Sequence, residues 1–168
     1  MSRYAKIGKN DIVNGKGVSV SFWAQGCPHR CPGCHNPETW DFKEGKEFSE
    51  SVVDEVLQAI SANGIVRNLS ILGGEPLAPA NLAMIESLIS AVKRKFPQIE
   101  ISMWTGYSYE ELSKNQVELV NMVDYLIDGE FDQKLRDITI GYAGSSNQKM
   151  IDVKATKEFQ EIKTLDNF

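Results

Sequence analysis

Hydrophobic and small polar residues alternate in short segments along this chain. The clearest segment covers residues 18–23, and residues 99–104 show the same alternation. Alternation with a period of two predicts a strand with one buried face. Two shorter apolar segments, 68–72 and 125–128, are each followed by a glycine. Glycine often ends a strand, so the pattern predicts four strands in this part of the chain.

Between these strands, hydrophobic residues recur with helical spacing. The first helical segment begins after Ser49, a suitable N-cap residue, and stops at Asn63-Gly64. A second helix is expected at about 79–95, where Pro97 closes it. A weaker helical pattern covers 109–122, with a break near 114–115. The apolar positions of the first helix are Val52, Val53, Val56, Leu57 and Ile60.

The alternation of strands and helices indicates parallel strands joined by crossover connections, which defines an α/β fold. A closed eight-stranded barrel typically needs ~250 residues, and this chain has 168. We therefore expect a partial (β/α) barrel or an open sheet of mostly parallel strands, with helices on the outer face.

The rest of the chain is expected to complete a single domain over residues 1–168, with its core at about 10–153. Residues 1–16 are polar and contain glycine, so we expect an irregular lead-in. Residues 36–48 are expected to form an extended loop. Residues 138–140 and 149–153 are candidates for further strands, and an irregular C-terminal tail should follow.

Turn residues follow each of the four predicted strands. In chain order they are Gly26 with a cysteine-rich loop, Gly73-Gly74-Glu75, Thr105-Gly106 and Asp128-Gly129. Ligands gather at the carboxyl ends of parallel strands. The order of these segments along the chain therefore predicts that they form one site.

Charge and hydropathy exclude some classes of function. The formal net charge is −5, which argues against a nucleic-acid surface because such a surface is basic. The chain contains no apolar run long enough to span a membrane, and no apolar stretch follows residues 1–6, so we expect no signal peptide. Three clustered cysteines do not suit a disulfide framework, so we expect reduced thiols and a cytoplasmic protein.

The cysteine loop carries the clearest candidate chemistry. Cys27, Cys31 and Cys34 are the only cysteines, at spacing C-x3-C-x2-C. An iron–sulfur cube bound by protein alone usually takes four cysteines, so three would leave one metal position open. The alternative is a zinc site completed by His29 or His35, but zinc modules usually separate their ligands into two pairs.

The turn Gly73-Gly74-Glu75-Pro76 is the second candidate site. Paired glycines after a strand let the backbone approach a ligand closely. A carboxylate at Glu75 can then accept a hydrogen bond from an ammonium group. Taken alone, a glycine turn before a helix is usually only a turn.

Together, the cysteine spacing and the Gly-Gly-Glu-Pro turn resemble the radical S-adenosylmethionine superfamily. The resemblance implies a partial barrel of the radical S-adenosylmethionine type and a 4Fe–4S cluster on Cys27, Cys31 and Cys34. Its fourth iron is exchangeable and chelates S-adenosylmethionine. Residues implied to contact S-adenosylmethionine are Gly33, Cys34, His35, Gly73, Gly74 and Glu75.

A closer resemblance extends over residues 10–153. Residues 26–37 with 39–40, 104–107 with 110–112, 126–131 and 144–148 are similar to the activating components of anaerobic (class III) ribonucleotide reductases. One departure is Ala143, where that family tends to have arginine. Lys149 or Arg136 could take the place of that arginine, or the contact could be absent.

The resemblance implies an activity and its partners. The chain would cleave S-adenosylmethionine and use the 5′-deoxyadenosyl radical to make a glycyl radical on the large subunit of the reductase. An external one-electron donor such as a flavodoxin would reduce the cluster. Two alternatives stay open: an activase of another glycyl radical enzyme, such as pyruvate formate-lyase, and a zinc-binding module without catalysis.

Overall fold

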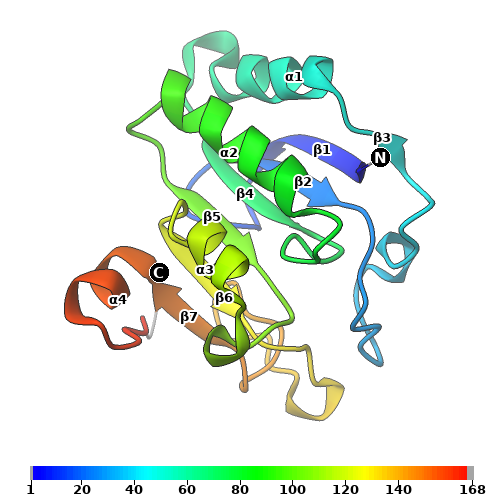
Figure 1. Ribbon diagram of the computed structural model, residues 1–168, viewed down its shortest axis with the longest axis vertical. Helices are drawn as coiled ribbons and strands as arrows, with labels where there is room; N and C mark the ends of the chain where they lie inside the picture. Colours follow the sequence, from blue (N-terminus) through cyan, green and yellow to red (C-terminus); the bar gives the residue numbers. More distant parts are fainter. Residues whose placement is uncertain (1, 166–168) are drawn as a thin grey trace.

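The computed structural model describes residues 2–165 and has an α/β architecture (Figure 1). Seven strands form one mixed sheet in the order β3-β1-β2-β4-β5-β6-β7. The four middle strands, β2, β4, β5 and β6, pair in parallel. The strands at both edges of this parallel group, β1 and β7, pair antiparallel to it. The predicted α/β class with mostly parallel central strands is therefore confirmed.

The strands are β1 (Arg3–Asp11), β2 (Ser19–Ala24), β3 (Lys46–Glu47), β4 (Asn68–Gly73), β5 (Ile101–Trp104), β6 (Tyr125–Asp128) and β7 (Lys149–Asp152). The α-helices are α1 (Glu50–Ile60), α2 (Leu82–Lys95), α3 (Lys114–Val120) and α4 (Val153–Phe159). Four short 3-10 helices complete the list: η1 (Pro37–Thr39), η2 (Ala62–Gly64), η3 (Tyr109–Glu111) and η4 (Gln133–Leu135). The four strands and three helices expected from periodicity are all present, with small shifts at their ends.

Four expectations outside the repeating part were wrong. The lead-in is not irregular, because Arg3–Asp11 forms β1 and pairs with β2. Its alternation is weak because this strand is only partly covered and buries Tyr4 alone. Residues 138–140 form a turn instead of a strand, with Ile138 85% exposed. The C-terminal tail contains α4, and the expected loop at 36–48 contains η1 and β3.

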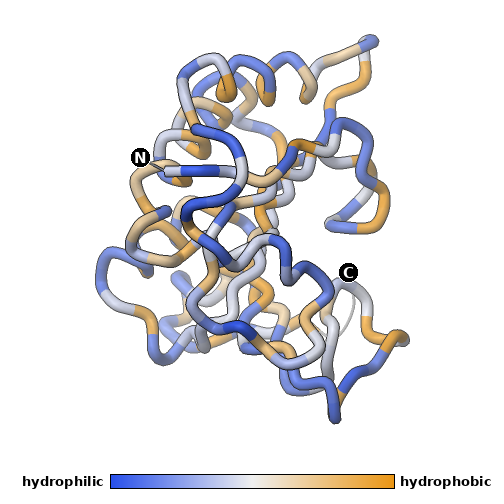
Figure 2. The backbone as a smooth tube through the Cα atoms, turned by 90° about the vertical axis from the view of Figure 1, so that its right-hand side faces the viewer, coloured by the Kyte–Doolittle hydropathy of each residue, from blue (hydrophilic) through white to orange (hydrophobic). Residues whose placement is uncertain are grey.

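One face of the sheet packs against helices. Phe22, Ile71 and Met103 lie in register on three neighbouring strands and are fully buried. The helices α1, α2 and α3 lie over this face (Figure 1) and contribute Val56, Ile85, Leu88 and Val120 to the same core. Along these helices hydrophilic and hydrophobic residues alternate (Figure 2), as expected for helices with one buried side.

The opposite face of the sheet is more polar. Ser21, Ser70 and Ser102 lie in register across β2, β4 and β5. Trp23 and Trp104 lie on the same face, two residues further toward the carboxyl ends. Loops cover this face, which leaves room for a cavity. Within residues 2–165, no helix is both long and apolar enough to cross a membrane.

Candidate functional site

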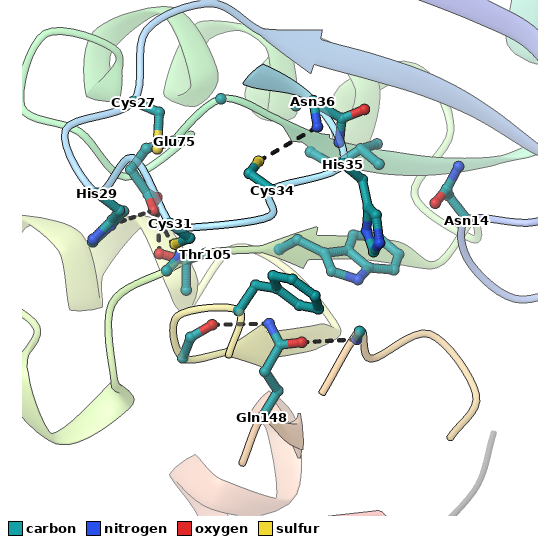
Figure 3. Close-up of a pocket in the computed structure, with 18 of the residues that line it drawn as sticks. Asn14, Cys27, His29, Cys31, Cys34, His35, Asn36, Glu75, Thr105 and Gln148 are labelled. Carbon is teal, nitrogen blue, oxygen red and sulfur yellow. Dashed lines mark hydrogen bonds and ion pairs between the residues drawn. The ribbon is translucent and has the colours of Figure 1, made fainter. Parts of the chain in front are cut away.

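A cavity of about 440 Å³ lies on this loop-covered face, toward the carboxyl ends of the parallel strands (Figure 3). The Gly-Gly-Glu turn and Thr105-Gly106 line it in full, and the cysteine loop contributes its three cysteines and both histidines. Gly129 represents the fourth segment. The expected convergence of strand ends is therefore present in the structure.

The cysteine loop is anchored by its main chain at its start. Gly26 N donates to Thr39 O at 2.8 Å, and Cys27 N donates to Trp40 O at 3.0 Å. Gly26 has φ +94°, and a side chain there would run into the ring of Phe42. The loop between the first two cysteines therefore begins from a defined position next to residues 39–42.

All three thiols line the same cavity. Burial raises the pKa of the Cys27 thiol to about 11 and also raises that of Cys31. The Sγ of Cys34 accepts a hydrogen bond from Asn36 N at 3.4 Å. Among residues 2–165, no three His, Cys, Asp or Glu side chains are already grouped as metal ligands.

The donors in this cavity nevertheless fit an iron–sulfur cluster. Three cysteines on one short loop are the donor type that such clusters take. Trp40 also lines the cavity, and its buried Nε1 has no acceptor among the described residues. An N–H group of this kind suits the sulfur atoms of a cluster, whose properties depend on such hydrogen bonds.

The two glycines of the Gly-Gly-Glu turn pack against main chain. A Cβ on Gly73 (φ +103°) would stand 2.8 Å from Ala24 O. A Cβ on Gly74 would stand 2.6 Å from Gly26 O. Gly74 N and Glu75 N donate to these same two carbonyls. The glycines therefore allow the ends of β2 and β4 to lie against each other, beside the cavity that both turns line.

Glu75 is fully buried, and its carboxylate accepts four hydrogen bonds from the chain itself. One oxygen accepts from Leu77 N and Thr105 Oγ1, both at 2.8 Å. The other accepts from Gly106 N at 2.7 Å and lies 2.9 Å from His29 Nε2. This carboxylate joins the end of β4 to the end of β5 and to the cysteine loop.

His29 lies between two carboxylates. Its Nε2 is 2.9 Å from Glu75 and its Nδ1 is 2.9 Å from Glu130. Burial acts to lower the pKa of His29, but its hydrogen bonds and charge interactions with Glu75 and Glu130 outweigh burial and raise it. Because both ring nitrogens face carboxylates, the alternative in which His29 completes a zinc site receives no support from this geometry.

The remaining predicted contact residues lie along the same loop. His35 lines the cavity and is exposed, with its ring 4.9 Å from that of Phe131. Gly33 (φ +76°) lies against Gln133, since a Cβ there would stand 2.7 Å from its Oε1. The roles of Gly33, Cys34 and His35 in binding a ligand stay predictions.

Sequence reasoning missed part of the cavity wall. Val13 and Asn14, from the turn between β1 and β2, line it, because this turn folds across the open face of the sheet. A second wall holds Tyr142, whose carbonyl accepts a hydrogen bond from Trp104 Nε1 at 2.7 Å. The available signal was the dipeptide Asn14-Gly15, which is typical of tight turns. In the structure Gly15 has φ +101° and packs on Ser70.

Gln148 shapes the second wall (Figure 3). Its Oε1 accepts from Gly144 N at 2.8 Å and Ser145 N at 3.2 Å, and its Nε2 donates to Gly129 O at 2.8 Å. One side chain thus joins the turn after β6 to the segment before β7. The motif at 144–148, noted only for its resemblance, has a structural explanation in these bonds.

Comparison with known proteins agrees with this site. Residues 13–151 match the family model described as a 4Fe-4S single cluster domain. The chain is 37% identical over 139 residues to the anaerobic ribonucleoside-triphosphate reductase-activating protein of Escherichia coli, covering 82% of this chain and 90% of that protein.

Two further relatives carry the same name. The protein from Salmonella typhi is 37% identical over 147 residues, covering 87% of this chain and 96% of that protein. The protein from Enterobacteria phage T4 is 37% identical over 147 residues, covering 88% and 92%. This chain therefore belongs to the 4Fe-4S single cluster domain family and, within it, to the anaerobic ribonucleoside-triphosphate reductase-activating proteins.

Proposed function

We propose that this protein is a radical S-adenosylmethionine enzyme that generates a glycyl radical on the large subunit of anaerobic ribonucleoside-triphosphate reductase. The observation that carries the proposal is the meeting of three thiols and the Gly-Gly-Glu turn in one cavity. The names of the relatives support the choice of partner. No observation favours a different glycyl radical enzyme as the substrate.

Cys27, Cys31 and Cys34 would hold a 4Fe–4S cluster, leaving one iron for an exchangeable ligand. When bound, the cluster supplies one electron that splits S-adenosylmethionine into methionine and a 5′-deoxyadenosyl radical, which takes a hydrogen atom from a glycine of the partner. The protein's part is to orient the reactants and to exclude water.

Gly33, Cys34 and His35 on the cysteine loop, with the turn at 73–75, would bind S-adenosylmethionine. The Glu75 carboxylate already accepts four hydrogen bonds within the chain. Its contribution to binding is therefore to hold the turn and the neighbouring strand ends in place. Trp23 and Trp104 add apolar surface to the cavity and limit access of water.

The sheet would act as a partial barrel of the radical S-adenosylmethionine type, within one domain over residues 1–168. Loops line the cavity on this face, and a loop of the large subunit would enter from this side. An external one-electron donor such as a flavodoxin would reduce the cluster. The cytoplasm suits this chemistry because thiols stay reduced there.

Anaerobic reconstitution tests the proposal. Iron and sulfide are added to the purified chain, followed by a reductant and S-adenosylmethionine. We expect a brown protein that forms 5′-deoxyadenosine and, with the large subunit present, a glycyl radical visible by electron paramagnetic resonance. Absence of 5′-deoxyadenosine would refute the cleavage step, and one zinc per chain in place of iron would refute the cofactor.

A further inference from the structure

His29 belongs to the cysteine loop but is not one of its proposed ligands, and its surroundings suggest another task. Its side chain is 9% exposed, although it lies between two cysteines on a loop. Its ring lies edge-on to Tyr107, with centroids 4.6 Å apart and an angle of 71° between the planes. A polar side chain held this closely is usually paired at each polar atom, and both ring nitrogens are.

The contact with Glu75 links three strand ends through one carboxylate. Glu75 follows β4, Thr105 and Gly106 follow β5, and His29 comes from the loop after β2 (Figure 3). The second contact, with Glu130, reaches the segment after β6. The two contacts differ in burial, because the Glu75 side chain is 1% exposed and that of Glu130 is 60% exposed. A buried pair is screened less by water, so the Glu75 contact should dominate.

Gly106 provides an independent sign that the ring position is required. A Cβ at this residue would stand 2.5 Å from Cδ2 and 2.7 Å from Nε2 of His29. The φ of Gly106 is not positive, so backbone conformation alone does not require glycine there. The absence of a side chain at Gly106 makes room for the imidazole beside Glu75.

We infer that His29 is a positioning residue that fixes the cysteine loop against the ends of β4 and β5 through the Glu75 carboxylate. This inference rests on the proposed function only for its consequence, which is retention of the cluster and of S-adenosylmethionine. The hydrogen bond between His29 and Glu75, which we call the brace, is made of protein groups alone and is present without either ligand.

Two substitutions of His29 by amide residues test the two contacts one at a time. The nitrogen of glutamine can occupy the position of His29 Nε2, and the nitrogen of asparagine that of Nδ1. His29→Gln therefore keeps a donor toward Glu75, and His29→Asn keeps one toward Glu130. Glu130→Gln is the matched control for the exposed contact, and His35→Asn is the control for loss of a histidine from the same loop.

The primary measurement is hydrogen exchange of the amides in residues 26–36 of the metal-free chain. We expect His29→Asn to speed exchange about tenfold in this loop, as for loss of a buried charged hydrogen bond, while exchange in the sheet is unchanged. His29→Gln, Glu130→Gln and His35→Asn should stay within about threefold of the original chain. Equal exchange in His29→Asn and the original chain, or equal acceleration in the asparagine and glutamine variants, would overturn the inference.

Gly106→Ala displaces the ring without changing His29 and keeps the inference testable if His29→Asn does not fold. It should speed exchange in residues 26–36 as His29→Asn does, and no change there would count against the brace.

After reconstitution, His29→Asn should release iron to a chelator about tenfold faster than His29→Gln and bind S-adenosylmethionine more weakly. If the original chain takes up no cluster, the proposed function fails, whereas the exchange experiment still decides whether the brace exists.

Discussion

The two faces of the sheet use the same strands for different purposes. On the face toward the helices, Phe22, Ile71 and Met103 are fully buried in the core. On the other face, Trp23 and Trp104 line a cavity next to three thiols. Neighbouring residues of one strand therefore serve stability on one side and binding on the other, because their side chains point to opposite faces.

This division has a consequence for mutations. The helix-covered face is close-packed, so removing atoms leaves a void. The loop-covered face already holds a cavity of about 440 Å³, so many changes there should spare the fold. The exceptions are side chains such as Glu75 that connect strand ends, and these should affect both stability and binding.

The largest expected effect is the loss of the cluster when any one of the three cysteines is replaced. Cys27→Ala, Cys31→Ala and Cys34→Ala should each abolish cluster binding, because two thiolates do not hold a cube well. Iron and sulfide content after anaerobic reconstitution measures the effect. Circular dichroism should show an intact fold, and a full cluster in any one variant would contradict the ligand assignment.

Adjacent residues on β2 give the sharpest test of the two faces. Phe22→Ala should lower the free energy of unfolding by about 3–5 kcal/mol, since it empties part of a packed core. Ser21→Ala removes only a hydroxyl that accepts a hydrogen bond from Trp23 Nε1 at 3.1 Å, and should cost about 1 kcal/mol. Urea unfolding of both variants measures the difference, and similar losses would mean that the loop-covered face is packed as tightly as the core.

Glu75 tests whether a residue of the site also supports the fold. Glu75→Gln leaves donors of the ends of β4 and β5 without a full set of acceptors. We expect it to lower the free energy of unfolding of the metal-free chain by about 1–3 kcal/mol. Glu111→Gln, at an exposed glutamate in η3, is a control. Unchanged stability in the Glu75 variant would indicate that the carboxylate serves the ligand alone.

The periodic part of the fold could be predicted from the sequence because burial imposes the period. The predicted strands at 68–72 and 125–128 correspond to β4 and β6, and the turns that follow them meet as expected. The N-terminal strand β1 could not be recognised because it buries Tyr4 alone, and its other positions are half-buried or exposed without a regular alternation. The helix α4 is only seven residues long, too short for a clear helical pattern.

Those residues of the site that belong to local sequence motifs could be predicted from the sequence. The cysteine spacing and the Gly-Gly-Glu turn place the thiols and Glu75 in one cavity, as expected. The partners of Glu75 were not predictable, since His29 is 46 positions away and Thr105 is 30 positions away. Contacts between such distant residues depend on how the strand ends pack, which no local pattern reports.

The smallest expected effect is a change of stability in alkaline solution through Tyr125, which pairs with Ser102 on the loop-covered face. Burial and the nearby charge of Glu100 raise the pKa of this phenol to about 12 from its usual value of 10.0. A raised pKa means that folding favours the neutral phenol. This contribution is complete below pH 10 and is lost as the pH rises through about 12.

Tyr125→Phe should therefore show a shallower loss of unfolding free energy over this range than the original chain. Parallel urea titrations from pH 9 upward measure it, and identical slopes would show that the phenol titrates alike in the folded and unfolded chain.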